Sequence, residues 1–113
     1  MKIAVTSTGP TLEDTVDPRF GRCPYFLIVD TESLEFEAVE NPNVTLGGGA
    51  GIQSASAMSV RGVSAVLTGN CGPNAYQTLA AAGIDVIIGC SGRIADAVEQ
   101  YKSGQATPAA EPS

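Results

Sequence analysis

Two stretches in the second half of the sequence share one pattern, and this pattern restricts the fold more than any other feature. Residues 62–72 and 83–92 each begin with glycine, continue through an apolar, β-branched run, and end in a turn that contains cysteine and glycine. A helical pattern follows each turn. Continuous apolar runs are typical of strands covered by helices on both faces of a sheet. Since helical crossovers join parallel strands, the repeat predicts two adjacent β-α units.

The first half of the chain predicts three more strands. Residues 2–7 and 25–30 are rich in β-branched and aromatic side chains, and residues 34–40 alternate apolar with acidic ones. The short turn at 31–33 indicates an antiparallel hairpin. Three helices are expected, at about residues 52–61, 73–82 and 93–103.

The resulting order, β-β-β-α-β-α-β-α, predicts an α/β fold. We expect a five-stranded mixed sheet flanked by three helices, with a ribonuclease-H-like topology. The first, fourth and fifth strands would be parallel, and the second would run antiparallel to the first. Residues 1–104 are expected to form a single domain. Residues 105–113 are rich in Ala, Pro, Ser and Glu and predict a flexible C-terminal tail.

The charge and the missing residue types exclude several functions. A net charge of −6 over 113 residues argues against binding nucleic acid, which requires a basic face. No apolar run approaches the roughly 20 residues of a membrane span, and the N-terminus lacks a signal-peptide pattern, so a cytoplasmic location without membrane contact is expected. The sequence has no histidine. Histidine bases, histidine-dependent triads and His-ligated zinc are therefore excluded.

Three cysteines are the candidates for metal ligation or thiol chemistry in this chain. Cys71 and Cys90 follow the two expected parallel strands, and Cys23 precedes the second strand, so all three are expected at one edge of the sheet. Their spacing matches no CxxC or zinc-ribbon pattern. They are either ligands of a metal at this edge or small buried apolar residues. Since Cys71 and Cys90 precede helices, lowered thiol pKa values and a thiol-based enzyme remain an alternative.

Arginines and glycine turns predict an anion site at the same edge. Arg19 and Arg22 lie in the long loop 8–24, and Arg93 lies in the first turn of the last helix. Helix N-termini carry free N–H groups and a positive dipole end, and arginine presents several donors in a plane. The alternative is that the loop arginines pair with acidic side chains of their own loop, namely Glu13, Asp14 or Asp17.

The glycine-rich segment 47–51 does not predict a nucleotide site. No Gly-Lys-Ser/Thr sequence follows it, as a Walker A loop requires, and its spacing does not fit a dinucleotide fingerprint.

A nuclease of the ribonuclease H type needs clustered carboxylates for its metal ions. The first strand carries none.

An ordered set of motifs resembles one protein family. The segment Asp17-Pro18-Arg19-Phe20-Gly21-Arg22-Cys23-Pro24-Tyr25-Phe26 is similar to the signature of the dinitrogenase iron–molybdenum cofactor biosynthesis family. Residues 49–51, 62–75 and 83–98 match its further segments in order. The resemblance covers residues 1–104 and fits a small standalone member.

The resemblance implies a ribonuclease-H-like fold that carries anionic metal–sulfur clusters or their precursors. One standalone member from sulfate reducers holds a molybdenum–copper sulfide cluster without firm covalent ligation, and some members work beside P-loop ATPases of the MinD type. The residues expected to bind the cofactor are Arg19, Phe20, Gly21, Arg22, Gly49, Gly51, Asn70, Gly72, Asn74 and Arg93. Cys23, Cys71 and Cys90 are the candidate metal ligands.

The sequence therefore supports three hypotheses about function. The first is a noncatalytic carrier of an anionic, molybdenum-containing metal–sulfur cluster, either a Mo–Cu sulfide or a precursor similar to the iron–molybdenum cofactor. The second is a thiol-based redox or transferase enzyme that uses Cys71 or Cys90. The third is a regulatory module that binds no cofactor and docks on a P-loop ATPase.

Overall fold

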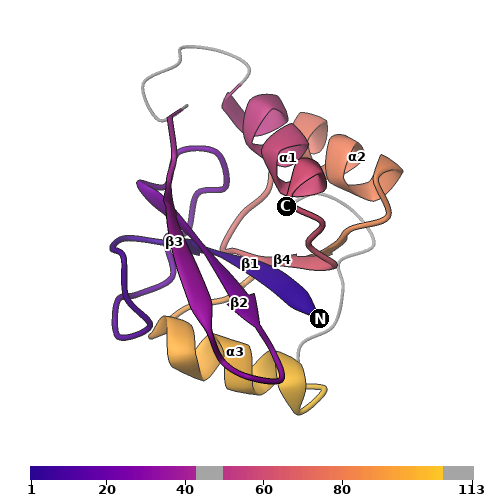
Figure 1. The fold of residues 1–113 in the computed structure, drawn as a ribbon. Helices are drawn as coiled ribbons and strands as arrows, with labels where there is room; N and C mark the ends of the chain where they lie inside the picture. Colours follow the sequence, from indigo (N-terminus) through magenta and orange to yellow (C-terminus); the bar gives the residue numbers. More distant parts are fainter. Residues whose placement is uncertain (43–49, 106–113) are drawn as a thin grey trace.

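The computed structural model describes residues 1–42 and 50–105 of the chain. Its elements follow the predicted order and are arranged in three layers, with the sheet between α1 and α2 on one side and α3 on the other (Figure 1). The strands are β1 (Lys2–Ser7), β2 (Tyr25–Asp30), β3 (Phe36–Glu40), β4 (Ala65–Leu67) and β5 (Asp85–Ile87). The helices are α1 (Ala50–Val60), α2 (Pro73–Ala81) and α3 (Ile94–Lys102).

The five strands form one mixed sheet in the order β3-β2-β1-β4-β5. β1 pairs antiparallel with β2 and parallel with β4, β2 pairs antiparallel with β3, and β4 pairs parallel with β5. This arrangement confirms the predicted α/β fold with its ribonuclease-H-like topology. The two β-α repeats of the sequence are the β4-α2 and β5-α3 units.

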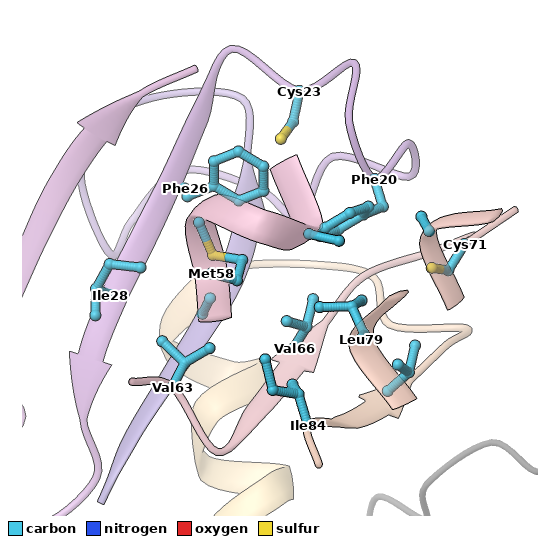
Figure 2. Close-up of a cluster of buried hydrophobic side chains, with 14 residues drawn as sticks. Phe20, Cys23, Phe26, Ile28, Met58, Val63, Val66, Cys71, Leu79 and Ile84 are labelled. Atoms are coloured by element: carbon cyan, nitrogen blue, oxygen red, sulfur yellow. The ribbon is translucent and has the colours of Figure 1, made fainter. Parts of the chain in front are cut away.

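A separate apolar core fills each side of the sheet, because successive side chains of a strand point to opposite faces. On β1, Ala4 belongs to the core under α1 and α2, whereas Ile3 and Val5 belong to the core under α3. Figure 2 shows the first core, in which Phe20 and Phe26 pack with a ring-centroid separation of 5.7 Å. Burial on both faces explains why the central strands are apolar throughout.

The structure moves several predicted boundaries by one to three residues. β3 begins at Phe36 and not at Leu34, because Leu34 belongs to the turn: its φ is 63° and its amide donates to Asp30 O at 2.8 Å. β4 and β5 are shorter than their apolar runs, and end at Leu67 and Ile87. α1 begins two residues earlier than expected.

Part of the sequence prediction lies outside the described residues. This applies to Gly49 and to residues 106–113, which make up nearly all of the predicted tail. Within residues 1–42 and 50–105, no helix has the length and apolar character that crossing a membrane requires.

Candidate functional site

The carboxyl ends of β1, β4 and β5 lie at one edge of the sheet, together with the start of β2. In the strand register, Val5 lies opposite Leu67, and Leu67 lies opposite Ile87. Ser7, at the end of β1, lies opposite Tyr25, the first residue of β2. Loops that follow these ends therefore meet at the edge where α/β sheets commonly bind ligands.

The loop between β1 and β2 is bound to this edge through backbone hydrogen bonds. The Asp17 amide donates to Thr6 O at 2.9 Å, the Asn70 amide donates to Pro18 O at 2.7 Å, and the Phe20 amide donates to Asn70 O at 3.2 Å. These bonds fix the position of Phe20 beside the turn that follows β4. The loop that carries Arg19 and Phe20 is therefore held against the turn after β4.

Gly69 permits the close approach of this loop. A Cβ atom at position 69 would lie 2.6 Å from Pro18 Cα and 2.9 Å from Pro18 Cβ. Contacts below 3.0 Å require the backbone of one segment to move. The turn after β4 thus accepts the loop only because residue 69 has no side chain.

Asp17 orients Arg19 within the loop. The Asp17 carboxylate is almost fully buried and accepts hydrogen bonds from Arg19 N at 2.9 Å, from Nε at 3.3 Å and from Nη2 at 3.4 Å. The bond and the charge of Asp17 raise the pKa of Arg19. The side chain of Arg19 is nevertheless 63% exposed. One of the two sequence alternatives, pairing of a loop arginine with Asp17, is thus observed for Arg19.

A pocket of about 190 Å³ lies beside this loop, at the N-termini of α1 and α2. Its lining includes four of the predicted cofactor-binding residues: Phe20, Gly51, Gly72 and Asn74. The remaining lining residues, Ile52, Pro73 and Ala75, were missed by the sequence analysis. Each is adjacent in sequence to a predicted site residue at an expected helix start. This adjacency is the sequence signal that could have identified them.

Two glycines shape the pocket in different ways. A Cβ atom on Gly51 would lie 3.1 Å from the Ala75 Cβ, so the N-terminal turns of α1 and α2 are in close contact. A Cβ atom on Gly72 would meet nothing within 4 Å. Gly72 lines the pocket and has no neighbour in the space that a side chain would take, so a ligand can approach its backbone.

The start of α2 provides hydrogen-bond donors for this space. Gly72 is the N-cap residue, no side chain caps the helix there, and Pro73 has no N–H. The first hydrogen bond of the helix runs from the Tyr76 amide to Gly72 O at 2.9 Å. The amides of Asn74 and Ala75 precede this ladder and belong to residues that line the pocket. The pocket thus suits a negatively charged ligand.

The structure divides the three cysteines between the two sides of the sheet. Cys23 and Cys71 are fully buried in the core under α1 and α2 (Figure 2), whereas Cys90 is half-buried and packs against the core under α3. The expected common edge holds for their backbones, but the turns direct the side chains to opposite faces. Among the described residues, no three Cys, Asp or Glu side chains are grouped so that they could hold a metal ion. The role of the cysteines as ligands stays a prediction.

Burial keeps these thiols protonated. It raises the pKa of Cys23 to about 12, with the negative charge of Asp17 acting in the same direction. Burial also raises the pKa of Cys71 to about 11 and shifts the pKa of Cys90 upward. The thiolate is the reactive form of cysteine, and a helix start can favour it by lowering the thiol pKa. None of the three cysteines has such a lowered pKa.

We expect this burial to make the protein less stable in alkali. Below the ordinary thiol pKa of 9.0, Cys23 is neutral in both the folded and the unfolded chain. As the pH rises from there toward about 12, the thiol ionises only in the unfolded chain, so the free energy of unfolding falls. Denaturant titrations of the wild type and of Cys23→Ala over this range measure the effect. The variant is expected to show a shallower alkaline slope, and identical slopes would contradict the assignment.

Arg93 lies apart from the residues that line the pocket. It is the N-cap residue of α3, and its side chain pairs with Glu13 at 3.0 Å and with Asp96 at 3.3 Å. These partners raise the pKa of Arg93. The adjacent backbone is bound to the loop, since the Ile94 amide donates to Asp14 O at 2.9 Å. Arg93 therefore connects the loop to α3.

Asn41 is a positioning residue that the sequence analysis missed. It is almost fully buried, and its Nδ2 donates to Gly21 O at 3.1 Å and to Cys23 O at 2.9 Å. Gly21 has a φ of 92°, which favours glycine, and the Arg22 amide donates to Arg19 O at 3.3 Å. Asn41 thus holds the turn that carries both loop arginines. No motif in the sequence marks it.

Comparison with known proteins identifies the family of this chain. The sequence model of the dinitrogenase iron-molybdenum cofactor family matches residues 1–104. The chain belongs to this family, as its motifs predict. Membership relates the chain to proteins that are named for a metal-containing cofactor.

Two relatives agree with this assignment. The apo form of the orange protein from Desulfovibrio gigas superposes with a TM-score of 0.96 at 43% identity, covering 99% of this chain and 95% of that one. An uncharacterized protein from Methanocaldococcus jannaschii is 34% identical over 108 residues, which span 93% of this chain and 88% of its own. The fold and nearly the whole length are thus shared with the orange protein.

Proposed function

We propose that this protein is a noncatalytic carrier that binds an anionic metal–sulfur cluster, containing molybdenum, in the pocket at the N-termini of α1 and α2. The observation that carries the proposal is the open, uncapped start of α2 at Gly72. The cluster is the cargo of the protein. Family membership and the similarity to the orange protein support a metal-cluster role.

The chemistry of the pocket fits a soft anion. Backbone amides at Asn74 and Ala75 and the positive end of the α2 dipole favour negative charge. The side chains of Phe20 and Ile52 provide apolar contact for a weakly hydrated sulfide surface. Arg19 lies in the same loop as Phe20, and its side chain is mostly exposed. Such a site binds without a bond from a thiolate to a metal.

The thiol-based enzyme is the weaker candidate. A nucleophilic cysteine requires an accessible thiolate, usually in an electropositive environment. Cys71 is buried and its pKa is raised to about 11, and the pKa of Cys90 is raised as well. These properties support a binding role over thiol chemistry.

Reconstitution of the apo protein tests the proposal. Apo protein mixed anaerobically with tetrathiomolybdate and Cu(I), then desalted, should retain both metals and show visible charge-transfer absorption. Parallel samples without copper, or with Fe(II) in its place, distinguish a Mo–Cu sulfide from other molybdenum–sulfur cargoes. If no sample retains molybdenum after desalting, the proposal is wrong.

The residues that hold the cluster can be ranked by the same measurement. We expect the double variant Arg19→Ala, Arg22→Ala to weaken uptake more than the triple variant Cys23→Ala, Cys71→Ala, Cys90→Ala. Loss of positive charge in the loop beside the pocket weakens the attraction for an anion, whereas the thiols are protonated. The reverse ranking would indicate ligation by thiolates.

Arg93→Ala serves as a control for the loss of an arginine elsewhere on the surface. None of the three arginines is among the residues that line the pocket, but Arg19 and Arg22 lie in the loop that carries Phe20, whereas Arg93 lies at the start of α3. Arg93 is 55% exposed and is paired with Glu13 and Asp96. Its removal changes the net charge by one unit without altering the pocket. We expect uptake by this variant to equal that of the wild type. A loss as large as that of the Arg19, Arg22 variant would extend the site to α3.

Delivery to a P-loop ATPase of the MinD type is a further proposal, based on the family resemblance. Pull-down of such an ATPase by apo and by cluster-loaded protein tests it. Binding that requires the cluster would support a carrier role. Equal binding by the apo protein, combined with failure of reconstitution, would favour a regulatory module that binds no cofactor.

A further inference from the structure

The outer edge of β3 is open in the described part of the chain. β3 is the terminal strand of the sheet and pairs only with β2 there (Figure 1). All of its residues except Val39 are exposed. An uncovered edge presents unpaired backbone donors and acceptors and is a template for a further strand.

The hydrogen-bond alternation shows which backbone groups are available. The Asp30 amide donates to Glu35 O at 2.9 Å, and the Asn41 amide donates to Pro24 O at 2.9 Å. In an antiparallel pair, such residues alternate with residues whose N–H and C=O groups point away from the partner strand. Phe36, Ala38 and Glu40 therefore direct their backbone groups outward.

The side chains along this edge define the charge of a suitable partner. β3 and the residue before it carry three carboxylates, on Glu35, Glu37 and Glu40. Arg61 pairs with Glu37 at 3.2 Å, and both side chains remain substantially exposed. Opposite charges on neighbouring strands stabilise their pairing, so the edge complements a basic strand. A second copy of β3 would bring three further carboxylates against these.

A groove beside β3 offers room for an apolar side chain of the partner. It has a volume of about 240 Å³ and includes nearly buried Ile28 and Phe36, which is 42% exposed. The other lining residues are Lys2, Asp30, Glu35 and Glu37. Ile28 gives this groove an apolar floor under a mainly acidic rim, which fits a segment in which basic and apolar residues alternate.

We propose that the edge of β3 is a docking site for an extended basic segment of a partner protein, which adds to the sheet as a further strand. Backbone hydrogen bonds at Phe36, Ala38 and Glu40 supply affinity, and the glutamates select the charge of the partner. The proposal is independent of the cluster site, which lies at the N-termini of α1 and α2.

A labelled peptide of alternating lysine and valine tests this proposal on the apo protein. Binding is followed by fluorescence anisotropy and by amide hydrogen exchange. We expect new protection at the amides of Phe36, Ala38 and Glu40, while Glu37 and Val39, already paired with β2, change little. A peptide N-methylated at every second residue lacks the donors for pairing and should lose binding by about tenfold or more.

Two protein variants provide matched controls. Ala38→Pro removes one outward donor at an edge position where proline is tolerated, and it should weaken binding about tenfold, whereas Ala38→Val keeps the donor and should bind as the wild type does. The double variant Glu35→Lys, Glu37→Lys should also weaken binding. This result does not depend on whether Ala38→Pro folds.

Several results would overturn the proposal. Absence of binding at about 1 mM peptide would show that the glutamates only protect the edge from association. Equal binding of the N-methylated peptide would indicate nonspecific attraction to an acidic surface. Concentration-dependent dimerisation that protects the same three amides would assign the edge to a second copy of the chain.

Discussion

Replacing Gly72 with aspartate is expected to abolish cluster uptake while leaving the fold intact. The new side chain enters open space, because a Cβ atom at this position meets nothing within 4 Å. Gly72 already has the extended conformation of an N-cap residue, with φ −67° and ψ 167°, so aspartate is expected to cap α2. It would occupy the backbone donors of α2 and place a negative charge beside the anion.

The expected magnitude follows from the electrostatics of a partly buried site. Two unit charges about 4 Å apart interact by about 4 kcal/mol near a protein surface, and each 1.4 kcal/mol corresponds to about tenfold in affinity. We therefore expect Gly72→Asp to weaken binding of the reconstituted cluster by nearly a thousandfold, about 700-fold. Desalting followed by metal analysis measures the retained cluster, and thermal unfolding measures stability. The free energy of unfolding should be equal to or slightly above that of the wild type.

Gly72→Asn is the matched control, because asparagine caps a helix as well as aspartate does but carries no charge. It should weaken uptake much less. The difference between the two variants should shrink at high salt, since salt screens the added charge. Equal effects of the two substitutions would show that the charge of the cluster is not what the pocket recognises.

Gly69→Ala is expected to detach the loop from the end of β4 and to cost about 1–3 kcal/mol of stability, as overpacking does. The added Cβ would lie 2.6 Å from Pro18 Cα, and backbone on both sides prevents a simple adjustment. The Asn70 amide, which donates to Pro18 O at 2.7 Å in the wild type, should then exchange its hydrogen faster. Because Phe20 and Arg19 move with the loop, cluster uptake should fall as well.

Gly72→Ala is the control for adding a methyl group to a glycine at this edge. It has no contact to disturb. Alanine is a poorer N-cap residue than glycine, but it restricts the unfolded chain at a compatible φ, so the net change in the free energy of unfolding should be small. Denaturant titration of both variants, together with hydrogen exchange at Asn70, makes the comparison. If Gly69→Ala is as stable as Gly72→Ala, the contact between the loop and the turn after β4 does not position the site.

The topology was predictable because local and global signals agree in this sequence. Glycine follows α1 and α2 at positions 62 and 83, where φ is 72° and 76°, and the apolar runs between the helices form the buried parallel strands. The turn at Leu34 was not predictable in this way. Leucine rarely adopts a positive φ, so nothing in the sequence predicted that it belongs to the turn before β3.

The candidate site was predictable as a location but only partly in its geometry. Phe20, Gly51, Gly72 and Asn74 meet in one pocket, because helix starts gather at the carboxyl edge of the sheet. The thiols could not be placed in the same way, since the direction of a side chain in a turn depends on backbone angles. The carboxamide of Asn41, which binds Gly21 O and Cys23 O, depends on contacts between distant segments.

The most direct test of cluster binding at the start of α1 and α2 is an amide NMR spectrum of the protein before and after reconstitution with tetrathiomolybdate and Cu(I). The largest shifts are expected on the amides of Phe20, Gly51, Ile52, Asn74 and Ala75. Amides near Arg93 in α3 and along β3 should be unchanged. Shifts concentrated at Cys90 and Arg93, with the pocket residues unaffected, would contradict the assignment of the cluster to the start of α1 and α2.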